Sequence, residues 1–260
     1  MKIRELIDDM RVWNDLNFKS KETVDQYLTG DMENEIKKVG VTMFASIEVI
    51  KKAIQMGINL LIVHEPTFYS NEETVDLNNP VHRAKKELLE NAGITVFRYH
   101  DHPHCMKGDL IDISTIKYSG LKGTITGKPH WAITEFVLDE ELTGSEVRAI
   151  LRDKLNAQWS RIAGATDKKG KVIAFACGTP GHIMELLLDD RTDFIVTGEV
   201  CEWIYGEFAR DLAALGKNKA LIIMGHCRSE YAGMIEVSRI IQEKFPQLEV
   251  HHLESGDVYQ

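Results

Sequence analysis

Three histidines and an aspartate stand close together in VFRYHDHPHCM, residues 96–106. His100, His102 and His104 follow a short apolar run that is typical of a buried strand. Neutral imidazole binds transition metals such as zinc, iron and nickel, and it also transfers protons near neutral pH. The stretch therefore predicts one side of a metal-binding or acid–base site, and other parts of the chain must supply the remaining groups.

Two further apolar runs end in the same kinds of side chain. LLIVHEP ends in His64 and Glu65, and LIIMGHCRSE ends in His226 and Glu230. The last two residues are four apart where a helix is expected to begin, a spacing that places both side chains on one helical face. A fourth run, FIVTGE, ends in Glu199. Histidine and carboxylate together form a ligand set that transition metals accept, so the strand ends predict a metal site.

The elements that must position these residues alternate between strand and helix along most of the chain. Apolar runs at 38–45 and 59–64 flank a helix that Ser46 can cap and Gly57 can end. The pattern then repeats, beginning with a helix at Pro80. Repeated units of this kind predict an α/β fold with mostly parallel core strands. Ligands of such sheets bind beyond the carboxyl ends of the strands, where the predicted residues lie.

A break in the pattern lies near TGKPHW, residues 126–131, where polar turn residues precede a new strand. We therefore expect a metal-binding α/β domain in two parts, 1–125 and 190–260. An intervening α/β subdomain is expected at 126–189.

Composition narrows the range of partners. The net charge of −9 argues against nucleic-acid binding, because such binding requires Lys and Arg that neutralise phosphates. The N-terminal MKIRELIDDMRVW lacks the apolar core of a secretory signal, and no tract is long and apolar enough to span a bilayer. We expect a cytoplasmic protein with no membrane partner.

Each of these residues also has an ordinary structural interpretation. A lone histidine at a strand end is more often exposed or hydrogen-bonded within the protein than bound to metal. An extended chain would point His102 away from its neighbours, toward solvent or behind the ligands. Arg98 and Arg228 could contact a phosphate, although a solvated charge is the usual state of an arginine. Recurrence at three strand ends favours the metal site.

The order and spacing of the motifs resemble the dinuclear-metal proteins known as GTP cyclohydrolase 1 type 2 homologues, or the Nif-three-like family. The resemblance runs from TVDQYLTGD through LLIVHEPTFY, VFRYHDHPHCMKGDLID and ACGTPGHIMELLLDDRTDFIVTGEV to GHCRSEYAGM. It implies a two-part α/β fold and a toroidal homohexamer. It also implies two divalent transition-metal ions per chain, facing an internal cavity.

Two positions depart from the family's motifs. The usual His-His-Pro reads HEP at 64–66, and the His-x-x-x-Asp motif ends in His104 instead of aspartate. The third motif, His-x-x-x-Glu, is intact. The two changes compensate in ligand type, so the resemblance implies three histidines and two carboxylates as metal ligands: His64, Glu65, His104, His226 and Glu230. We expect metal binding to persist with an altered preference among Zn, Fe, Mn and Ni.

The resemblance implies a hydrolase in which metal-bound water attacks a small-molecule substrate, and the family name points to C–N hydrolysis in a purine nucleotide. His100 is the expected general acid or base, whereas Glu199, His102 and Arg228 are weaker candidates for contacts with the substrate or behind the ligands. CGTPGH lacks the Gly-Lys-Ser/Thr ending of a P-loop and is expected to be a strand-to-helix turn. The alternative is a noncatalytic metal-binding hexameric scaffold or regulatory protein, which needs neither an open coordination position nor turnover.

Overall fold

The computed structural model describes residues 1–13, 23–106 and 108–259. The chain forms two compact units, each of which is described by itself. Unit 1 comprises Met1–Lys107 and Met234–Gly256, and unit 2 comprises Gly108–Gly233 and Asp257–Gln260.

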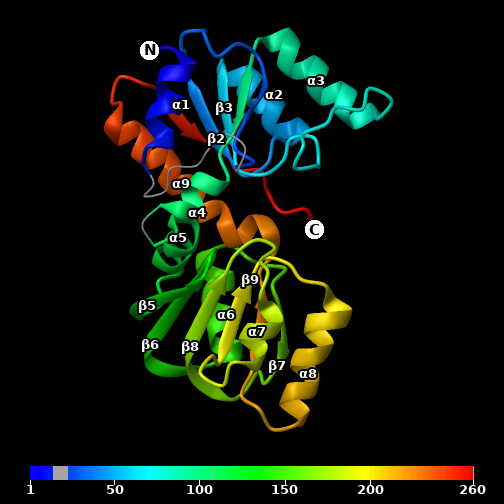
Figure 1. Cartoon of the computed structure of the whole chain (residues 1–260), viewed down its shortest axis with the longest axis vertical. Coiled ribbons are helices and arrows are strands. Elements are labelled where there is room, and N and C mark those ends of the chain that lie inside the picture. Colours follow the sequence, from blue (N-terminus) through cyan, green and yellow to red (C-terminus); the bar gives the residue numbers. More distant parts are fainter. Residues whose placement is uncertain (14–22, 107, 260) are drawn as a thin grey trace. The chain divides into compact units, whose positions relative to one another are not determined.

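Unit 1 contains a five-stranded sheet in the order β1-β4-β3-β2-β11. Figure 1 labels two of its strands, β2 and β3. Its strands are β1 (Tyr27–Thr29), β2 (Val39–Thr42), β3 (Leu60–Val63), β4 (Thr95–Arg98) and β11 (Val250–His252). Every neighbouring pair is parallel except β1 with β4. The predicted parallel core is therefore confirmed in this unit.

The helices of unit 1 begin and end at residues that the sequence marks. They are α1 (Ile3–Arg11), α2 (Ile47–Met56), α3 (Pro80–Ala92), the short α4 (Asp101–Cys105) and the part of α9 (His226–Lys244) from Met234 on. At the start of α2 the Ser46 side chain accepts a hydrogen bond from Val49 N, and Gly57 ends the helix with φ of 72°. Asn79 caps α3, and Gly93 ends it with φ of 64°. These caps confirm the predicted strand–helix–strand units.

Unit 2 contains a six-stranded sheet in the order β5-β6-β8-β9-β10-β7. Its strands are β5 (Gly123–His130), β6 (Ile133–Thr143), β7 (Arg161–Gly164), β8 (Lys169–Ala176), β9 (Phe194–Thr197) and β10 (Ala220–Ile223). The three central strands β8, β9 and β10 are parallel, while the outer pairs are antiparallel.

Both faces of the central strands in unit 2 are buried. Along β9, Phe194 and Val196 join the apolar cluster that contains Val147 and Leu151 of α6 (Gly144–Lys154). The residue between them, Ile195, points to the opposite cluster. That second cluster includes residues of α7 (Ile183–Leu188) and α8 (Glu207–Ala214), and a π-helical turn, η1 (Glu202–Gly206), precedes α8. The alternation is the period of two that a strand buried on both faces requires.

The observed division differs from the predicted segments. Residues 126–131 are the end of β5 and the turn into β6, so the polar residues there make a hairpin within one sheet. Strands β9 and β10 pair with β8, and the sequence interpretation had separated them from it. The chain instead divides before α5 (Leu110–Ser119) and within α9 (His226–Lys244), between residues 233 and 234.

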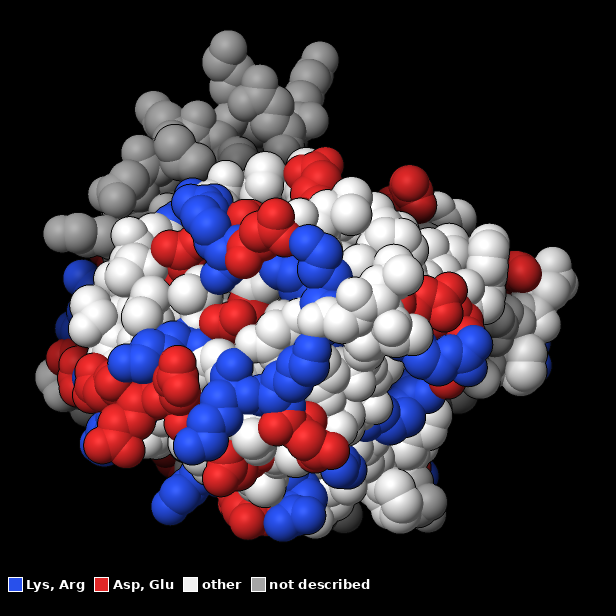
Figure 2. Space-filling model, turned by 90° about the horizontal axis from the view of Figure 1, so that it is seen from below, with Lys and Arg blue, Asp and Glu red and all other residues white. Residues whose placement is uncertain are grey.

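The surface carries charges of both signs. Figure 2 shows one face on which Lys and Arg lie among Asp and Glu. Exposed ion pairs such as Lys217 with Asp190, at 3.2 Å, are of this mixed kind. Among the described residues, no helix combines the length and apolar composition that a membrane crossing requires.

Candidate metal-binding groups

Two neighbouring parallel strands place the first histidines of unit 1. Strands β3 and β4 pair with Val63 opposite Arg98, so His64 follows one strand where Tyr99 and His100 follow the other. The backbone N–H of Tyr99 donates to Val63 O at 2.7 Å, which continues the pairing past the strand ends. The predicted convergence at carboxyl strand ends is therefore present within this unit.

The hydrogen bond of His64 defines its tautomer. Its Nδ1 lies 3.1 Å from the Tyr99 carbonyl oxygen, and the side chain is fully buried. A carbonyl oxygen only accepts, so the neutral ring carries its proton on Nδ1. Its Nε2 then presents a lone pair. Histidines that bind metals commonly have this arrangement, because the bond at one nitrogen orients the other toward the ion.

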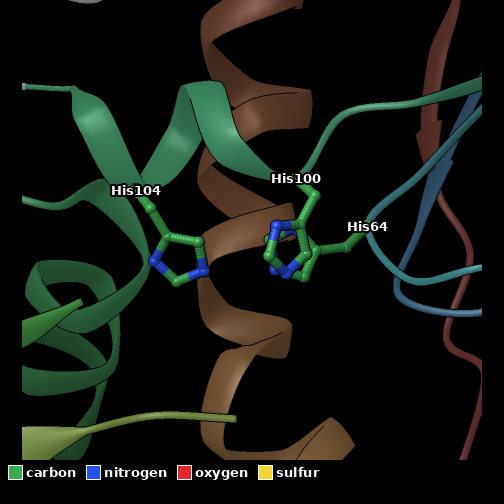
Figure 3. A group of neighbouring side chains, drawn as sticks. All are labelled: His64, His100 and His104. Carbon is green, nitrogen blue, oxygen red and sulfur yellow. The ribbon is translucent and has the colours of Figure 1, made fainter. Parts of the chain in front are cut away.

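Three imidazoles of unit 1 lie close enough to share a metal ion. The rings of His64 and His100 stack at 4.6 Å between centroids, and the His104 ring lies 5.3 Å and 5.2 Å from them. One nitrogen from each ring falls within 4.8 Å of the others. Figure 3 shows the His104 ring pointing toward the stacked pair. The structure thus groups His100, predicted as an acid or base, with two predicted ligands.

Glu65 adds a carboxylate to this group. It is buried, and its Oε1 lies 3.7 Å from His100 Nε2. Its other oxygen lies 3.9 Å from the guanidinium of Arg98, which also donates to Asn71 Oδ1 at 3.1 Å and to the carbonyl oxygen of His64. Arg98 is fully buried, so its interpretation as a solvated charge was wrong.

A carboxylate distant in sequence holds the segment that carries the histidines. Asp25 is buried and accepts hydrogen bonds from the backbone N–H groups of His100, Asp101 and His102, at 2.8, 2.7 and 3.2 Å. Its Oδ2 also lies 2.5 Å from His102 Nδ1. These bonds fix the start of α4 as a side-chain cap does.

Of the two positions expected for His102, facing solvent or lying behind the ligands, the first is wrong. The chain forms the short helix α4 there and does not remain extended. His102 is buried, bonds Asp25 and stacks on Tyr99. Its contacts indicate that it supports the backbone of α4.

Asp101 holds the ring of His100. Its Oδ1 lies 2.9 Å from His100 Nδ1. Burial acts to raise the pKa of Asp101, but hydrogen bonds from His100 and the backbone N–H of Val24 outweigh it and lower that pKa to about 2. The ionised carboxylate favours the proton of a neutral His100 ring on Nδ1, which leaves Nε2 as the acceptor that faces Glu65.

Unit 2 carries the remaining predicted residues at the start of α9. His226 Nε2 lies 3.1 Å from Glu230 Oε2, as the predicted spacing of four on one helical face requires. Its Nδ1 lies 2.9 Å from Glu199 Oε1, to which Thr179 also donates. The hydrogen bond with His226 is the main cause that lowers the pKa of Glu199 to about 2, against partial burial. Glu230 is buried, and the short distance between its carboxylate oxygen and the His226 nitrogen would allow both atoms to contact one ion.

Gly178 leaves space for the Glu230 carboxylate because it has no side chain. Gly178 follows β8 with φ of 70°, and a Cβ there would lie 2.4 Å from Glu230 Oε1. Its N–H donates to the hydroxyl of Ser229, and its carbonyl accepts from the N–H of Glu199 at 2.9 Å. The segment CGTPGH is thus the expected turn after a strand, and it also packs against a predicted ligand.

Comparison with known proteins identifies the family. The model of the family described as Duf34/NIF3 (NGG1p interacting factor 3) matches residues 1–257. The chain belongs to the Duf34/NIF3 family. A family relative from Clostridium perfringens, named GTP cyclohydrolase 1 type 2 homolog, is 26% identical over 249 residues, which cover 94% of this chain and 92% of the relative.

Solved structures show the same fold. A Bacillus cereus protein related to NIF3 has a TM-score of 0.78 at 15% identity and covers 100% of this chain and 99% of its own. A Staphylococcus aureus hypothetical protein, SA1388, has a TM-score of 0.79 at 17% identity, covering 100% of this chain and 98% of its own. The two-part α/β fold expected of the Nif-three-like family is confirmed.

Other residues of this family member lie differently from expectation or carry no sequence signal. Arg228 is buried, with its Nε 3.9 Å from Asp257 Oδ2, so a substrate contact would have to compete with that pairing. Asp25 and Gly178 were not predicted. The hydrogen bonds of Asp25 join residues far apart in the sequence, so they leave no local sequence pattern. Gly178 lies in a glycine-containing turn directly after a strand, and a glycine there is a signal that another group approaches the backbone closely.

A cavity of about 570 Å³ in unit 2 lies apart from the predicted ligands. Arg148, Arg161 and Arg210 line it together with Glu202 and Glu207. Arg161 pairs with Glu202 at 3.0 Å, and Arg210 pairs with Glu207. Because these ion pairs offset much of the positive charge of the arginines, the cavity has little net positive charge to attract an anion.

Proposed function

We propose that this chain is a metal-dependent hydrolase that binds two divalent transition-metal ions per chain. The observation that carries the proposal is the Nδ1 hydrogen bond of His64 to a backbone carbonyl, within a group of three imidazoles and a carboxylate. In unit 1 the proposed ligands are His64, Glu65 and His104. In unit 2 they are His226 and Glu230.

The donor set suits Zn²⁺, Fe²⁺, Mn²⁺ or Ni²⁺, because it mixes imidazole with carboxylate and contains no thiolate. An ion held by such ligands supplies Lewis acidity and lowers the pKa of a bound water to near neutrality. His100 is the proposed general acid or base. Asp101 keeps its Nδ1 protonated, so that Nε2 can accept a proton.

The names of the relatives support a substrate class for this proposal. We propose a purine nucleotide and C–N hydrolysis, since the relatives carry the name GTP cyclohydrolase 1 type 2 homolog. We also propose the homohexameric assembly that the family resemblance implies. Light scattering of the purified chain tests the assembly independently of catalysis.

The test begins with metal content, measured by plasma mass spectrometry on tag-free protein reconstituted with each ion. His64→Ala and His226→Ala, made separately, are each expected to lower the bound metal. His251→Ala is the matched control, because it removes a surface histidine that also contacts a glutamate, Glu249, at 2.8 Å. Wild-type metal content in both variants would refute the metal ligands proposed here.

The second step is turnover. With metal bound, the wild-type chain is expected to consume GTP, measured by chromatography of the ring-opened product, and His100→Gln is expected to abolish turnover while metal stays bound. Metal binding without turnover on panels of nucleotides, phosphoesters and amides would reject the hydrolase and favour a metal-binding scaffold.

A further inference from the structure

Unit 2 holds another group of metal-ligand side chains, none of which takes part in the proposed catalytic centre. His130 is the last residue of β5, while His182 and Glu185 lie at the start of α7. One ligand atom from each lies within 4.8 Å of the other two. The fold therefore brings together two imidazoles and a carboxylate from separate elements.

The distances in this group suit a tetrahedral ion. Glu185 Oε2 lies 2.9 Å from His182 Nδ1 and 3.6 Å from His130 Nε2. Ligand atoms about 2.0–2.1 Å from a tetrahedral zinc ion are about 3.3 Å from one another. The two observed separations bracket that value, and turning one of the two rings would direct all three ligand atoms toward one ion.

The two rings are held face to face. Their centroids are 4.3 Å apart with an interplanar angle of 6°. The lone pair of each neutral imidazole lies in the plane of its ring, so binding of one ion to both rings would turn one of them out of this parallel arrangement. Glu185 would supply the third ligand atom.

The backbone at His182 supports a specific role for its side chain. The residue has φ of 61°, a left-handed conformation that is unfavourable for a residue with a side chain. It stands at the capping position of α7, yet makes no capping hydrogen bond to the helix backbone and instead contacts Glu185. The histidine thus adopts an unfavourable backbone conformation in which its side chain contacts Glu185.

We propose that His130, His182 and Glu185 bind a divalent transition-metal ion, with Zn²⁺ the best match. The three side chains are 36%, 47% and 61% exposed, so solvent has direct access to the ion. Three protein ligands leave a fourth position for water or an external donor. The ion would link the β5–β6 hairpin to the start of α7, and its binding would raise the melting temperature of the chain.

The test uses the full chain with His64→Ala and His226→Ala as background, so that the ligands of the proposed catalytic centre are weakened. Calorimetric titration with Zn²⁺ is expected to find one remaining site. His182→Asn, which keeps a residue that tolerates positive φ, and Glu185→Gln are each expected to weaken binding at least about tenfold. His251→Ala, made in the same background, is expected to leave the affinity unchanged.

Trp131 gives a second readout, because it adjoins His130 and is 53% exposed. Binding of Ni²⁺ is expected to quench its fluorescence, and Trp131→Phe removes that part of the signal. Circular dichroism verifies that each variant is folded. Zn²⁺ affinity within twofold of the background in both His182→Asn and Glu185→Gln would overturn the proposal, as would an equal loss in the His251 control. In the otherwise wild-type chain, His182→Asn leaves hydrolysis unchanged, which separates this site from the proposed function.

Discussion

Replacing Asp25 with alanine removes the contact that fixes the segment carrying three of the histidines. The carboxylate accepts three consecutive backbone N–H groups at the start of α4 and lies 2.5 Å from the His102 ring. Asp25→Ala leaves those donors in a buried region where neither side chain nor helix can satisfy them. We expect α4 to loosen and the chain to lose stability.

The magnitude follows from the number and kind of these bonds. Hydrogen bonds to a charged group contribute about 1.5–3 kcal/mol each, although such contributions do not add. Loss of an ordinary helix cap costs about 0.5–2 kcal/mol, and removing one partner of a buried ionic contact costs about 3–5 kcal/mol. Because water can enter the space of the lost carboxylate, we expect Asp25→Ala to lower the free energy of unfolding by about 3–4 kcal/mol.

Asp25→Asn separates charge from shape. The amide oxygen can still accept from His100 N and Asp101 N, but its NH₂ group then faces the N–H of His102. The His102 ring can adapt by moving its proton to Nε2 and accepting at Nδ1. We expect a loss of about 1–2 kcal/mol, between wild type and alanine.

Guanidinium unfolding followed by circular dichroism measures these differences. Asp31→Ala is the control in the same unit, since Asp31 accepts one exposed bond from Glu33 N, and its effect should stay within about 0.5 kcal/mol. Metal affinity should fall about 10- to 100-fold in Asp25→Ala, because α4 carries the proposed ligand His104. An Asp25→Ala chain within 1 kcal/mol of wild type, with unchanged metal content, would refute this reasoning.

Two further substitutions test unit 2. Gly178→Ala should lower the free energy of unfolding by about 1–2 kcal/mol because of the positive φ at this position, and it should also lower the bound metal because it displaces Glu230. Gly57→Ala is the control: Gly57 has a matching φ of 72° with open space around it, so the substitution should lower stability alone. Plasma mass spectrometry measures the bound metal, and equal metal content in the Gly178→Ala and Gly57→Ala variants would contradict the role of Gly178. Burial lowers the pKa of Lys219 and outweighs nearby aspartates, so the unfolded chain holds that proton more tightly. The unfolding free energy of wild type relative to Lys219→Met should therefore rise as the pH increases toward the ordinary lysine pKa of about 10.4 and level off above it, in denaturation curves at each pH, and a flat difference would count against it.

Local signals predicted the regular elements because their causes are local. Ser46 with Gly57, and Asn79 with Gly93, mark helix ends through side-chain caps and left-handed glycines. The run of β3 is apolar throughout since the strand is buried on both faces. Short edge strands such as β1 and β7 were missed, because they are three and four residues long and only partly buried.

The helix α4 shows why part of the candidate site escaped prediction. The segment DHPHC has few residues that favour helix, and its histidines followed a predicted strand. Its conformation depends on Asp25, which lies 75 positions before His100. A hydrogen bond between residues so far apart leaves no periodic pattern, so the sequence predicted the histidines but left two positions open for His102, facing solvent or behind the ligands.

The two departures from the family motifs fall in one unit. Glu65 and His104 both belong to unit 1, in the segments that follow β3 and β4. A buried carboxylate at position 65 needs a compensating charge, and Arg98, itself fully buried, lies 3.9 Å from it. The His104 ring meanwhile packs 5.2 Å from His100. The exchange therefore preserves one carboxylate and its imidazole neighbours within a single group, which is the physical basis for expecting metal affinity to persist with a changed preference.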